Sequence, residues 1–455
     1  MKFCFISEPE KTIFSKSNYF GPDMYFKSIK QTVSRLIKSN YYRNAFTLIS
    51  GSVIAQAFLV VITPILSRIF TPEDFGLYAS FLAVTGILSI VATLRYELAI
   101  LLPKKDKEAG QIFLLASFIS LVIGLITLLI VPMVKDMPWV QELTKIDSGI
   151  IFFLVPAGIV LYDLTKTSSY LANRNKHYKW LSYGRISGSV TTGGLGIVLG
   201  LLGWSAAGLV VGKVIGWIAE SMVFLFPSRK AIANVIPKTR WNNLRTLAAR
   251  YRNFPKYSTP EGLLNTGFKQ MPILLLTAWF SIDMAGYYSV AFMLLSKPLG
   301  MVSAAFGQVF FQQGASLDRE DQGSLRKLFK DNLIFLFFLA VIPCILIAIF
   351  APPLFTFILG DNWEMTGIFV RWLMPFSFIT FLKGPFSAMV DIKNKIGQNV
   401  FFEIGFFIIS ILAFYIGFVK NDALLGVQCF SFGCTLLGIF QLRWFYALTK
   451  VESRW

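Results

Sequence analysis

The stretch "IFTPEDFGLYASF", from Ile69 to Phe81, has a second copy about 210 residues further along the chain, "WFSIDMAGYYSVAF", from Trp279 to Phe292. The matched positions are Phe70 and Phe280, Thr71 and Ser281, Glu73 and Asp283, Gly76 and Gly286, and Tyr78 and Tyr288. A hydroxyl residue followed by an acid is typical of the first turn of a helix, where both groups complement free backbone N–H donors. Pro72 suits the first helical position. The stretch therefore predicts a tight turn between two helices, present twice.

Long apolar runs flank each copy of this motif. The 455-residue chain is 55% hydrophobic and only 15% charged, with a mean hydropathy of +0.61. A soluble domain carries about a quarter charged residues, and about 20 apolar residues in a row span a bilayer. We therefore expect an all-α polytopic membrane protein with about twelve spans. Their approximate positions are 44–69, 76–100, 109–132, 148–172, 179–202, 205–228, 254–280, 285–311, 332–350, 364–391, 396–419 and 423–448.

A second repeat indicates how these spans are organised. Pro156 and Pro375 each interrupt a span, and 18 residues later the chain reads "RNK" (174–176) and "KNK" (393–395). Together the two repeats predict two six-helix lobes that are parallel, because each has an even number of spans, around a central cavity. The expected segments are a cytoplasmic N-terminal segment 1–43, an N-lobe 44–228, a basic linker 229–253, a C-lobe 254–449 and a tail 450–455.

The net charge of +18 is explained by topology. Of the Lys and Arg residues outside the predicted spans, 30 fall on the side of the two termini and 4 on the other side. This asymmetry predicts cytoplasmic termini, with a contribution from anionic lipid. Nucleic-acid binding needs a basic face on a soluble domain, which the sequence does not predict.

The N-terminal segment and the rare residues add further expectations. "MYFKSIKQTVSRLIKSNYYRN", Met24 to Asn44, predicts either a basic amphipathic helix on the inner leaflet or a solvated tail, and Met24 is an alternative start. No secretory signal peptide is expected. His177, the single histidine, lies in a basic loop, and the four cysteines match no disulfide or metal pattern. We expect no metal site and no cofactor.

A family resemblance rests on "SRIFTPEDFGLYA" at the end of the first span and "RYELAILLPKKDKEA" at the end of the second. With twelve spans in two lobes, the chain resembles the Wzx-type polysaccharide flippases of the multidrug/oligosaccharidyl-lipid/polysaccharide exporter superfamily. The resemblance is densest over 44–110. It implies a protein of the bacterial inner membrane that moves undecaprenyl-pyrophosphate-linked oligosaccharide from the cytoplasmic to the periplasmic leaflet by alternating access.

The same resemblance implies a setting in surface polysaccharide biosynthesis. The glycan would be lipopolysaccharide O-antigen, capsule or exopolysaccharide. The implied partners are the lipid-linked cargo, membrane lipids, and polysaccharide polymerase and chain-length regulator proteins. Transport would be coupled to H⁺, Na⁺ or the membrane potential, and no bond of the cargo would be made or broken.

Charged residues inside the spans are candidates for binding this cargo, since a charge in hydrocarbon is costly. Lys269 and Lys297 lie about 22 and 18 Å into their spans, and Arg371 and Lys213 lie about 10–12 Å in from the opposite side. We expect these four cations to face the pyrophosphate in the central cavity. For the two lysines, pairing with an acid such as Glu261 is the alternative.

Two further pairs each allow two interpretations. Arg95 and Glu97, in "LRYELAI", match the second-span motif and predict either a gate that pairs with the other lobe or an ion pair within the lobe. Asp163 either binds a coupling ion, because a desolvated carboxylate titrates closer to neutrality, or pairs with Lys166 three residues on.

Two helix features complete the expected site. Pro260 and Pro272, in "YSTPEGLLNTGFKQMP", predict a hinge or a static kink in the seventh span. The glycine-rich run "SGSVTTGGLGIVLGLLG" in the fifth span lacks a Walker lysine, so close helix packing is its better interpretation.

The rival functions fit these charges less well. A cation-coupled multidrug antiporter of the same superfamily favours an acidic cavity, whereas the deep charges of the C-lobe are basic. A membrane glycan-modifying enzyme needs an intramembrane histidine or an acidic motif in a large loop, and 229–253 is basic. We therefore expect a transporter and no enzyme.

Overall fold

The computed structural model describes residues 40–138, 140–141, 149–320, 322–393 and 395–449. The account below concerns the compact unit that begins at Leu48. Most of the predicted surface helix of Met24 to Asn44 and the whole of the tail 450–455 lie outside the described residues.

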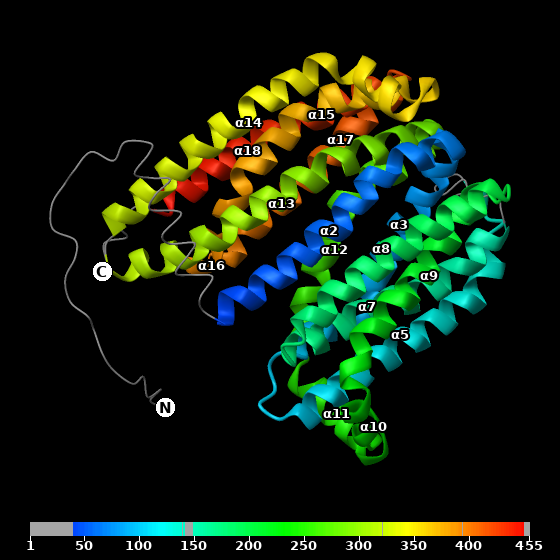
Figure 1. Cartoon of the computed structure of the whole chain (residues 1–455), viewed down its shortest axis with the longest axis vertical. Coiled ribbons are helices and arrows are strands. Elements are labelled where there is room, and N and C mark those ends of the chain that lie inside the picture. The colour runs from blue at the N-terminus through cyan, green and yellow to red at the C-terminus, as the bar shows by residue number, and fades with distance from the viewer. Residues whose placement is uncertain (1–39, 139, 142–148, 321, 394, 450–455) are drawn as a thin grey trace. The chain divides into compact units, whose positions relative to one another are not determined.

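Twelve helices of 20 residues or more make up the described part of the chain, which contains no strand. They are α2 (Asn40–Ile69), α3 (Pro72–Thr93), α5 (Asp106–Val134), α7 (Gly149–Arg174), α8 (Tyr178–Leu201), α9 (Ser205–Leu225), α12 (Thr259–Trp279), α13 (Ile282–Glu320), α14 (Gln322–Leu359), α15 (Glu364–Lys383), α17 (Ile396–Val419) and α18 (Ala423–Ala447) (Figure 1). The predicted all-α membrane architecture is confirmed. We call α2 to α9 the N-lobe and α12 to α18 the C-lobe.

The helices differ in how well they suit a membrane. Within the described residues, ten helices are long and apolar enough to cross one. The other two long helices, α8 and α12, are more polar. They carry Arg185 and Lys269 among their polar side chains, and a span that faces a polar cavity is expected to be less apolar than one surrounded by lipid.

The turns predicted from the motif are confirmed. The Thr71 hydroxyl caps α3 by accepting from the Asp74 N–H at 3.2 Å, and the Asp74 carboxylate accepts from the Thr71 N–H at 2.9 Å. In the second copy the Ser281 hydroxyl accepts from the Met284 N–H at 3.3 Å. The acid that closes the first cap is Asp74, next to the matched Glu73. Each cap satisfies a free donor at a helix start.

Two segments expected as loops are helical. The linker forms α10 (Arg229–Val235) and α11 (Trp241–Arg250), and a π-helical turn at Phe254–Ser258 leads into α12. The break expected between the predicted spans 285–311 and 332–350 is the second such segment, and that expectation is wrong, because α13 continues to Glu320 and α14 begins at Gln322. That segment has no proline to end a helix, and its charged residues suit helical turns in water.

The glycine-rich run in α8 serves helix packing, as the sequence indicates. A Cβ built on Gly193 would lie 2.9 Å from the Ile62 side chain of α2, and one on Gly200 would lie 2.6 Å from Phe70. On the other side, a Cβ on Gly216 of α9 would lie 2.1 Å from the Thr192 hydroxyl of α8. Glycine therefore lets α8 pack closely against both α2 and α9.

The two copies of the repeated motif pack against each other and join the lobes. A Cβ on Gly76 would lie 2.1 Å from the carbonyl oxygen of Ile282, and one on Gly286 would lie 1.9 Å from the carbonyl oxygen of Pro72. Positions 72 and 282 are equivalent in the repeat, as are 76 and 286, so the contact is symmetric. Only glycine permits two backbones to approach this closely. The motif is repeated because its two copies form one contact between α3 and α13.

Candidate functional site

The contact between the lobes is strongest at the end of the helices where the motif lies, which we call the motif end (69–72, 279–282 and 359–363). The Trp363 indole N–H donates to the Ser67 carbonyl at 2.9 Å, and the Ser67 hydroxyl donates to the Leu359 carbonyl at 2.9 Å. The Trp363 side chain is 1% exposed and packs edge-on against Phe75 and Tyr287. These contacts seal the motif end between α2, α3, α13 and α14.

The lobes also meet along α3 and α12. Near the motif end the Ser80 and Thr277 hydroxyls are hydrogen-bonded at 3.1 Å. Towards the opposite end, which carries α10 and α11 and which we call the linker end, a Cβ on Gly262 would lie 3.1 Å from the Arg95 guanidinium. The seam therefore runs along the whole length of α3.

Two of the predicted cations come from opposite lobes and act on each other. Lys213 of α9 and Lys297 of α13 are close enough for their charges to repel. At 1.5 Å per residue they lie about 12 and 22 Å from the motif end of their helices, which is deep in the membrane. The Lys213 ammonium lies 5.3 Å from the centre of the Trp217 ring, and Lys297 is exposed. An anion with several oxygens that lay between the two lobes would be attracted by both ammonium groups.

Sequence reasoning identified Lys213, and it named Glu220 as a possible partner only for Lys269 and Lys297. Glu220 of α9 lies close enough to attract both Lys213 and Arg185. The Arg185 guanidinium of α8 donates a hydrogen bond to the Ser52 hydroxyl of α2. Arg185 is thus partly satisfied within the N-lobe, while Lys213 shares a single acid with it.

Lys269 of α12 belongs to a polar network inside the C-lobe. Its ammonium donates to the Asn265 side-chain oxygen at 2.8 Å, and the Asn265 amide donates to the Glu403 carboxylate of α17 at 3.3 Å. Glu403 also attracts Lys383 of α15. The Lys383 ammonium donates to the Gln441 oxygen at 2.6 Å. One carboxylate therefore serves two lysines, so the network has an excess of positive charge.

A cavity of about 230 Å³ lies beside Lys269, between α12, α13 and α15. Apolar side chains form most of its wall, including Phe292, Leu299 and Phe376. Gly300 also lines it, and a Cβ there would meet no atom within 4 Å. The cavity thus places an apolar surface directly next to an exposed ammonium group.

Arg371 has a structural environment that differs from that of the lysines. Its Nε donates to the Ala348 carbonyl at 3.0 Å, and its Nη2 donates to the Ile349 carbonyl at 3.1 Å. Both carbonyls lie in α14, four residues before Pro352 and Pro353, which have no N–H to donate to them. The guanidinium thus replaces two missing helical hydrogen bonds, and our functional proposal rests on the other three cations.

Asp163 and Lys166 form the ion pair considered from the sequence. Their charged atoms are 3.0 Å apart, and the Asp163 carboxylate is 1% exposed. Its two oxygens accept from the Ser89 hydroxyl at 2.5 Å and the Ser120 hydroxyl at 2.8 Å. The cluster ties α3, α5 and α7 together, and each carboxylate oxygen of Asp163 has at least one donor. Binding of a coupling ion at Asp163 stays a prediction.

Arg95 and Glu97 lie at a break in the helix after α3. Leu94 and Arg95 both have left-handed backbone conformations, and the short helix α4 (Tyr96–Ala99) follows. Arg95 and Glu97 are 3.7 Å apart, and Glu97 is 1% exposed, with no hydrogen bond to a described residue. The intralobe pair is thus present but long, while the guanidinium lies against Gly262 of the other lobe.

The remaining candidates lie in the first helix of the C-lobe. Glu261 is exposed and forms no ion pair with a described residue. Pro260 occupies the first turn of α12, where a missing N–H costs no hydrogen bond, and it directly follows the π-helical turn. Pro272 lies inside α12 and is buried. Hinge motion at either proline stays a prediction.

Comparison with solved structures shows the fold of a transporter superfamily. The lipid II flippase MurJ, in an inward closed conformation, has a TM-score of 0.65 and 11% identity, covering 88% of this chain and 86% of that chain. An inward-facing multidrug resistance MATE family transporter of the MOP superfamily has a TM-score of 0.56 and 16% identity, covering 90% of this chain and 96% of that chain. An outward-facing multidrug resistance MATE family transporter of the MOP superfamily has a TM-score of 0.57 and 13% identity, covering 92% of this chain and 99% of that chain. At these identities the likeness concerns the fold alone.

The sequence comparisons add the family. No curated protein sequence matches the chain. The family model described as "Polysaccharide biosynthesis protein" matches residues 65–366, which is about two thirds of the chain. The chain belongs to the polysaccharide biosynthesis protein family, in agreement with the polysaccharide-related resemblance drawn from the motif.

Proposed function

We propose that this multi-pass membrane protein is a flippase for undecaprenyl-pyrophosphate-linked oligosaccharide. It moves the cargo from the cytoplasmic to the periplasmic leaflet of the bacterial inner membrane, with both of its termini in the cytoplasm. The pathway is the assembly of a surface polysaccharide such as O-antigen, capsule or exopolysaccharide. Family membership and the transporter fold support this assignment in its general form.

The facing cations of the two lobes carry the specific proposal. Lys213 and Lys297 repel each other deep in the membrane, and Lys269 belongs to a network with more positive than negative charge. A pyrophosphate has several anionic oxygens and would offset these charges while it is shielded from hydrocarbon. The cation-rich site thus provides the binding energy for the cargo group that cannot cross a bilayer unaided.

The apolar cavity beside Lys269 suits the adjoining part of the same cargo. A pyrophosphate held by Lys269 would place the first isoprene units of the lipid next to the aromatic wall of this cavity. A free anion has no apolar part that could pack against this wall. The combination therefore favours a phosphate joined to an apolar chain over a free anion.

Alternating access would proceed by movement of the lobes about their shared seam. The motif end is sealed by Gly76, Gly286 and Trp363, so release at this end requires these contacts to separate. The motif end would face the periplasm. The energy source would be H⁺, Na⁺ or the membrane potential, and polymerase and chain-length regulator proteins would act on the released cargo.

The test is lipid extraction and mass spectrometry of cells that lack the gene, compared with cells in which it is restored. We expect an undecaprenyl-pyrophosphate oligosaccharide to accumulate without the gene and surface glycan to be lost. The fold is shared with MATE transporters, which makes a multidrug antiporter the second candidate. A change in drug sensitivity with no lipid-linked intermediate would favour that candidate and overturn the proposal.

A further inference from the structure

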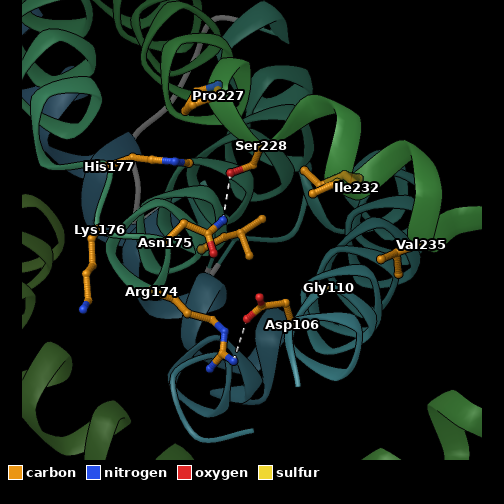
Figure 2. Close-up of a pocket in the computed structure, with 12 residues that line it drawn as sticks. Asp106, Gly110, Arg174, Asn175, Lys176, His177, Pro227, Ser228, Ile232 and Val235 are labelled. Atoms are coloured by element: carbon orange, nitrogen blue, oxygen red, sulfur yellow. Dashed lines mark hydrogen bonds and ion pairs between the residues drawn. The ribbon is translucent and has the colours of Figure 1, made fainter. Parts of the chain in front are cut away.

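A second polar cavity lies at the linker end of the N-lobe, away from the proposed cargo path. Its volume is about 370 Å³, and it lies between the start of α5, the turn from α7 to α8, and α10 (Figure 2). The lining residues that matter here are Arg174, Asn175, Lys176, His177 and Ser228. Nothing in the proposed flippase mechanism uses this cavity.

Two residues that line the cavity each contain a buried nitrogen atom with no hydrogen-bond partner among the described residues. These atoms are Nε of Arg174 and Nδ1 of His177. The other guanidinium nitrogens of Arg174 donate to the Asp106 carboxylate at 3.0 Å and to the Leu101 carbonyl at 3.3 Å, which fixes the orientation of the group. The Arg174 guanidinium carries only donors and the His177 ring carries at least one, so both side chains can donate to a ligand that accepts hydrogen bonds.

Further donors point to the same chemistry. The Asn175 amide donates to the Ser228 hydroxyl at 3.0 Å, which leaves the hydroxyl hydrogen of Ser228 free to donate into the cavity (Figure 2). Lys176 at the edge adds a positive charge, and its left-handed backbone, with φ of 57°, ends α7. The one acid in the lining, Asp106, has a side chain that is 90% exposed. The cavity therefore suits an anion with several oxygens, such as a phosphate group.

The surroundings indicate where this phosphate comes from. The wall formed by α10 is apolar and includes Ile232 and Val235. On the same linker, Ile236 and Trp241 are 55% and 63% exposed. The Trp241 ring packs edge-on against Phe118 of the membrane helix α5, with the ring centres 5.7 Å apart. Exposed tryptophan beside a membrane helix is typical of the bilayer interface, where lipid head groups lie.

The linker is also basic, with eight Lys and Arg residues between positions 229 and 256. Basic residues next to apolar ones at a membrane surface favour anionic lipids. We propose that this cavity binds the phosphate of an anionic phospholipid from the leaflet at the linker end. The lipid chains would lie along the apolar surface of α10 and hold the linker against α5.

The test uses the purified full-length protein, freed of lipid, with native mass spectrometry as the readout. The probes are phosphatidylglycerol and phosphatidylcholine, and inorganic phosphate is titrated separately by calorimetry. We expect phosphatidylglycerol to bind at least tenfold more tightly than phosphatidylcholine. The double variant His177→Phe/Ser228→Ala should lose at least tenfold in phosphatidylglycerol affinity, because it removes two donors to a charged ligand.

Matched variants separate the cavity from general charge effects. Lys176→Ala and Lys179→Ala remove the same charge three residues apart, but only Lys176 lines the cavity. We expect weaker phosphatidylglycerol binding for Lys176→Ala alone, with unchanged thermal unfolding of the lipid-free protein for both. Equal binding by wild type and the double variant would overturn the proposal. In the contrary case, inorganic phosphate would bind as tightly as phosphatidylglycerol and lose this binding in the double variant. That result would assign the cavity to a soluble phosphate and overturn the proposal of a lipid ligand.

Discussion

The contact between Gly76 and Gly286 can be tested by adding a single methyl group. A Cβ on Gly286 would lie 1.9 Å from the Pro72 carbonyl oxygen, more than 1 Å inside the closest ordinary contact. Because the obstacle is backbone, the helices α3 and α13 have to separate. Overpacking of this kind costs about 1–3 kcal/mol, which corresponds to about a 5- to 150-fold shift away from the sealed motif end.

Spin labels at Arg68 and Asn362, both exposed at the motif end, would report this shift as a longer distance between the lobes. We expect Gly286→Ala to lengthen the distance in reconstituted protein. Gly194→Ala is the matched control, since a Cβ on Gly194 would meet no atom within 4 Å. An unchanged distance distribution in Gly286→Ala would refute the close backbone contact as the seal of this end.

Three further substitutions follow from the contacts. Arg371→Met leaves two α14 carbonyls without donors, so we expect the free energy of unfolding to fall by about 1–3 kcal/mol per carbonyl and the unfolding temperature to drop. Arg371→Lys should give an intermediate unfolding temperature. Equal unfolding temperatures for wild type and Arg371→Met would contradict the stabilising role of these two hydrogen bonds. Asp163→Asn leaves the half-buried Lys166 without its acid and should destabilise by up to about 3–5 kcal/mol, and adding Lys166→Met should restore folding in the same unfolding assay; no recovery would mean that Asp163 does more than balance that charge. Gly300→Trp fills the cavity beside Lys269 and should stop glycan export in correctly inserted protein, whereas Gly300→Ala should not; normal export by the tryptophan variant would exclude the cavity from the cargo path.

The helices and the turns between them follow from local chemistry and could be predicted. Thr71 and Ser281 cap the helices that follow them because a hydroxyl there accepts a free N–H, whatever the rest of the fold does. The length of the apolar runs sets the number of spans. The helical segment 312–331 was missed because its charged residues and its two glycines, Gly314 and Gly323, look like a loop between two spans, although they also suit helical turns in water.

The side-chain partners inside the membrane depend on how distant helices pack, which spacing in the sequence does not reveal. Lys269, Glu403 and Lys383 come from three helices, so their network could not be deduced from any one of them. Arg371 looked like a cargo ligand because of its depth. The adjacent Pro352 and Pro353 were the available signal for its structural role, since two freed carbonyls in a membrane helix need donors.

The glycine at positions 76 and 286 was partly predictable from the sequence and partly explained only by the structure. Its presence in both copies of the motif marked it in the sequence as part of a repeated structural unit. The reason for the glycine is that Gly286 approaches the Pro72 carbonyl and Gly76 approaches the Ile282 carbonyl, which only the packing of α3 on α13 reveals. The sequence thus indicates that the two halves are alike, and the structure indicates that their likeness creates the contact between them.

The central claim is that lysines from both lobes hold the pyrophosphate of a lipid-linked oligosaccharide. The most direct measurement is the amount of this intermediate, by lipid mass spectrometry, in cells that carry Lys213→Glu from the N-lobe, Lys297→Glu from the C-lobe or the exposed control Lys420→Glu in place of the wild type. The account predicts accumulation of the intermediate in the first two strains and wild-type levels in the third, with equal amounts of protein in the membrane. Wild-type levels in all three strains would contradict it.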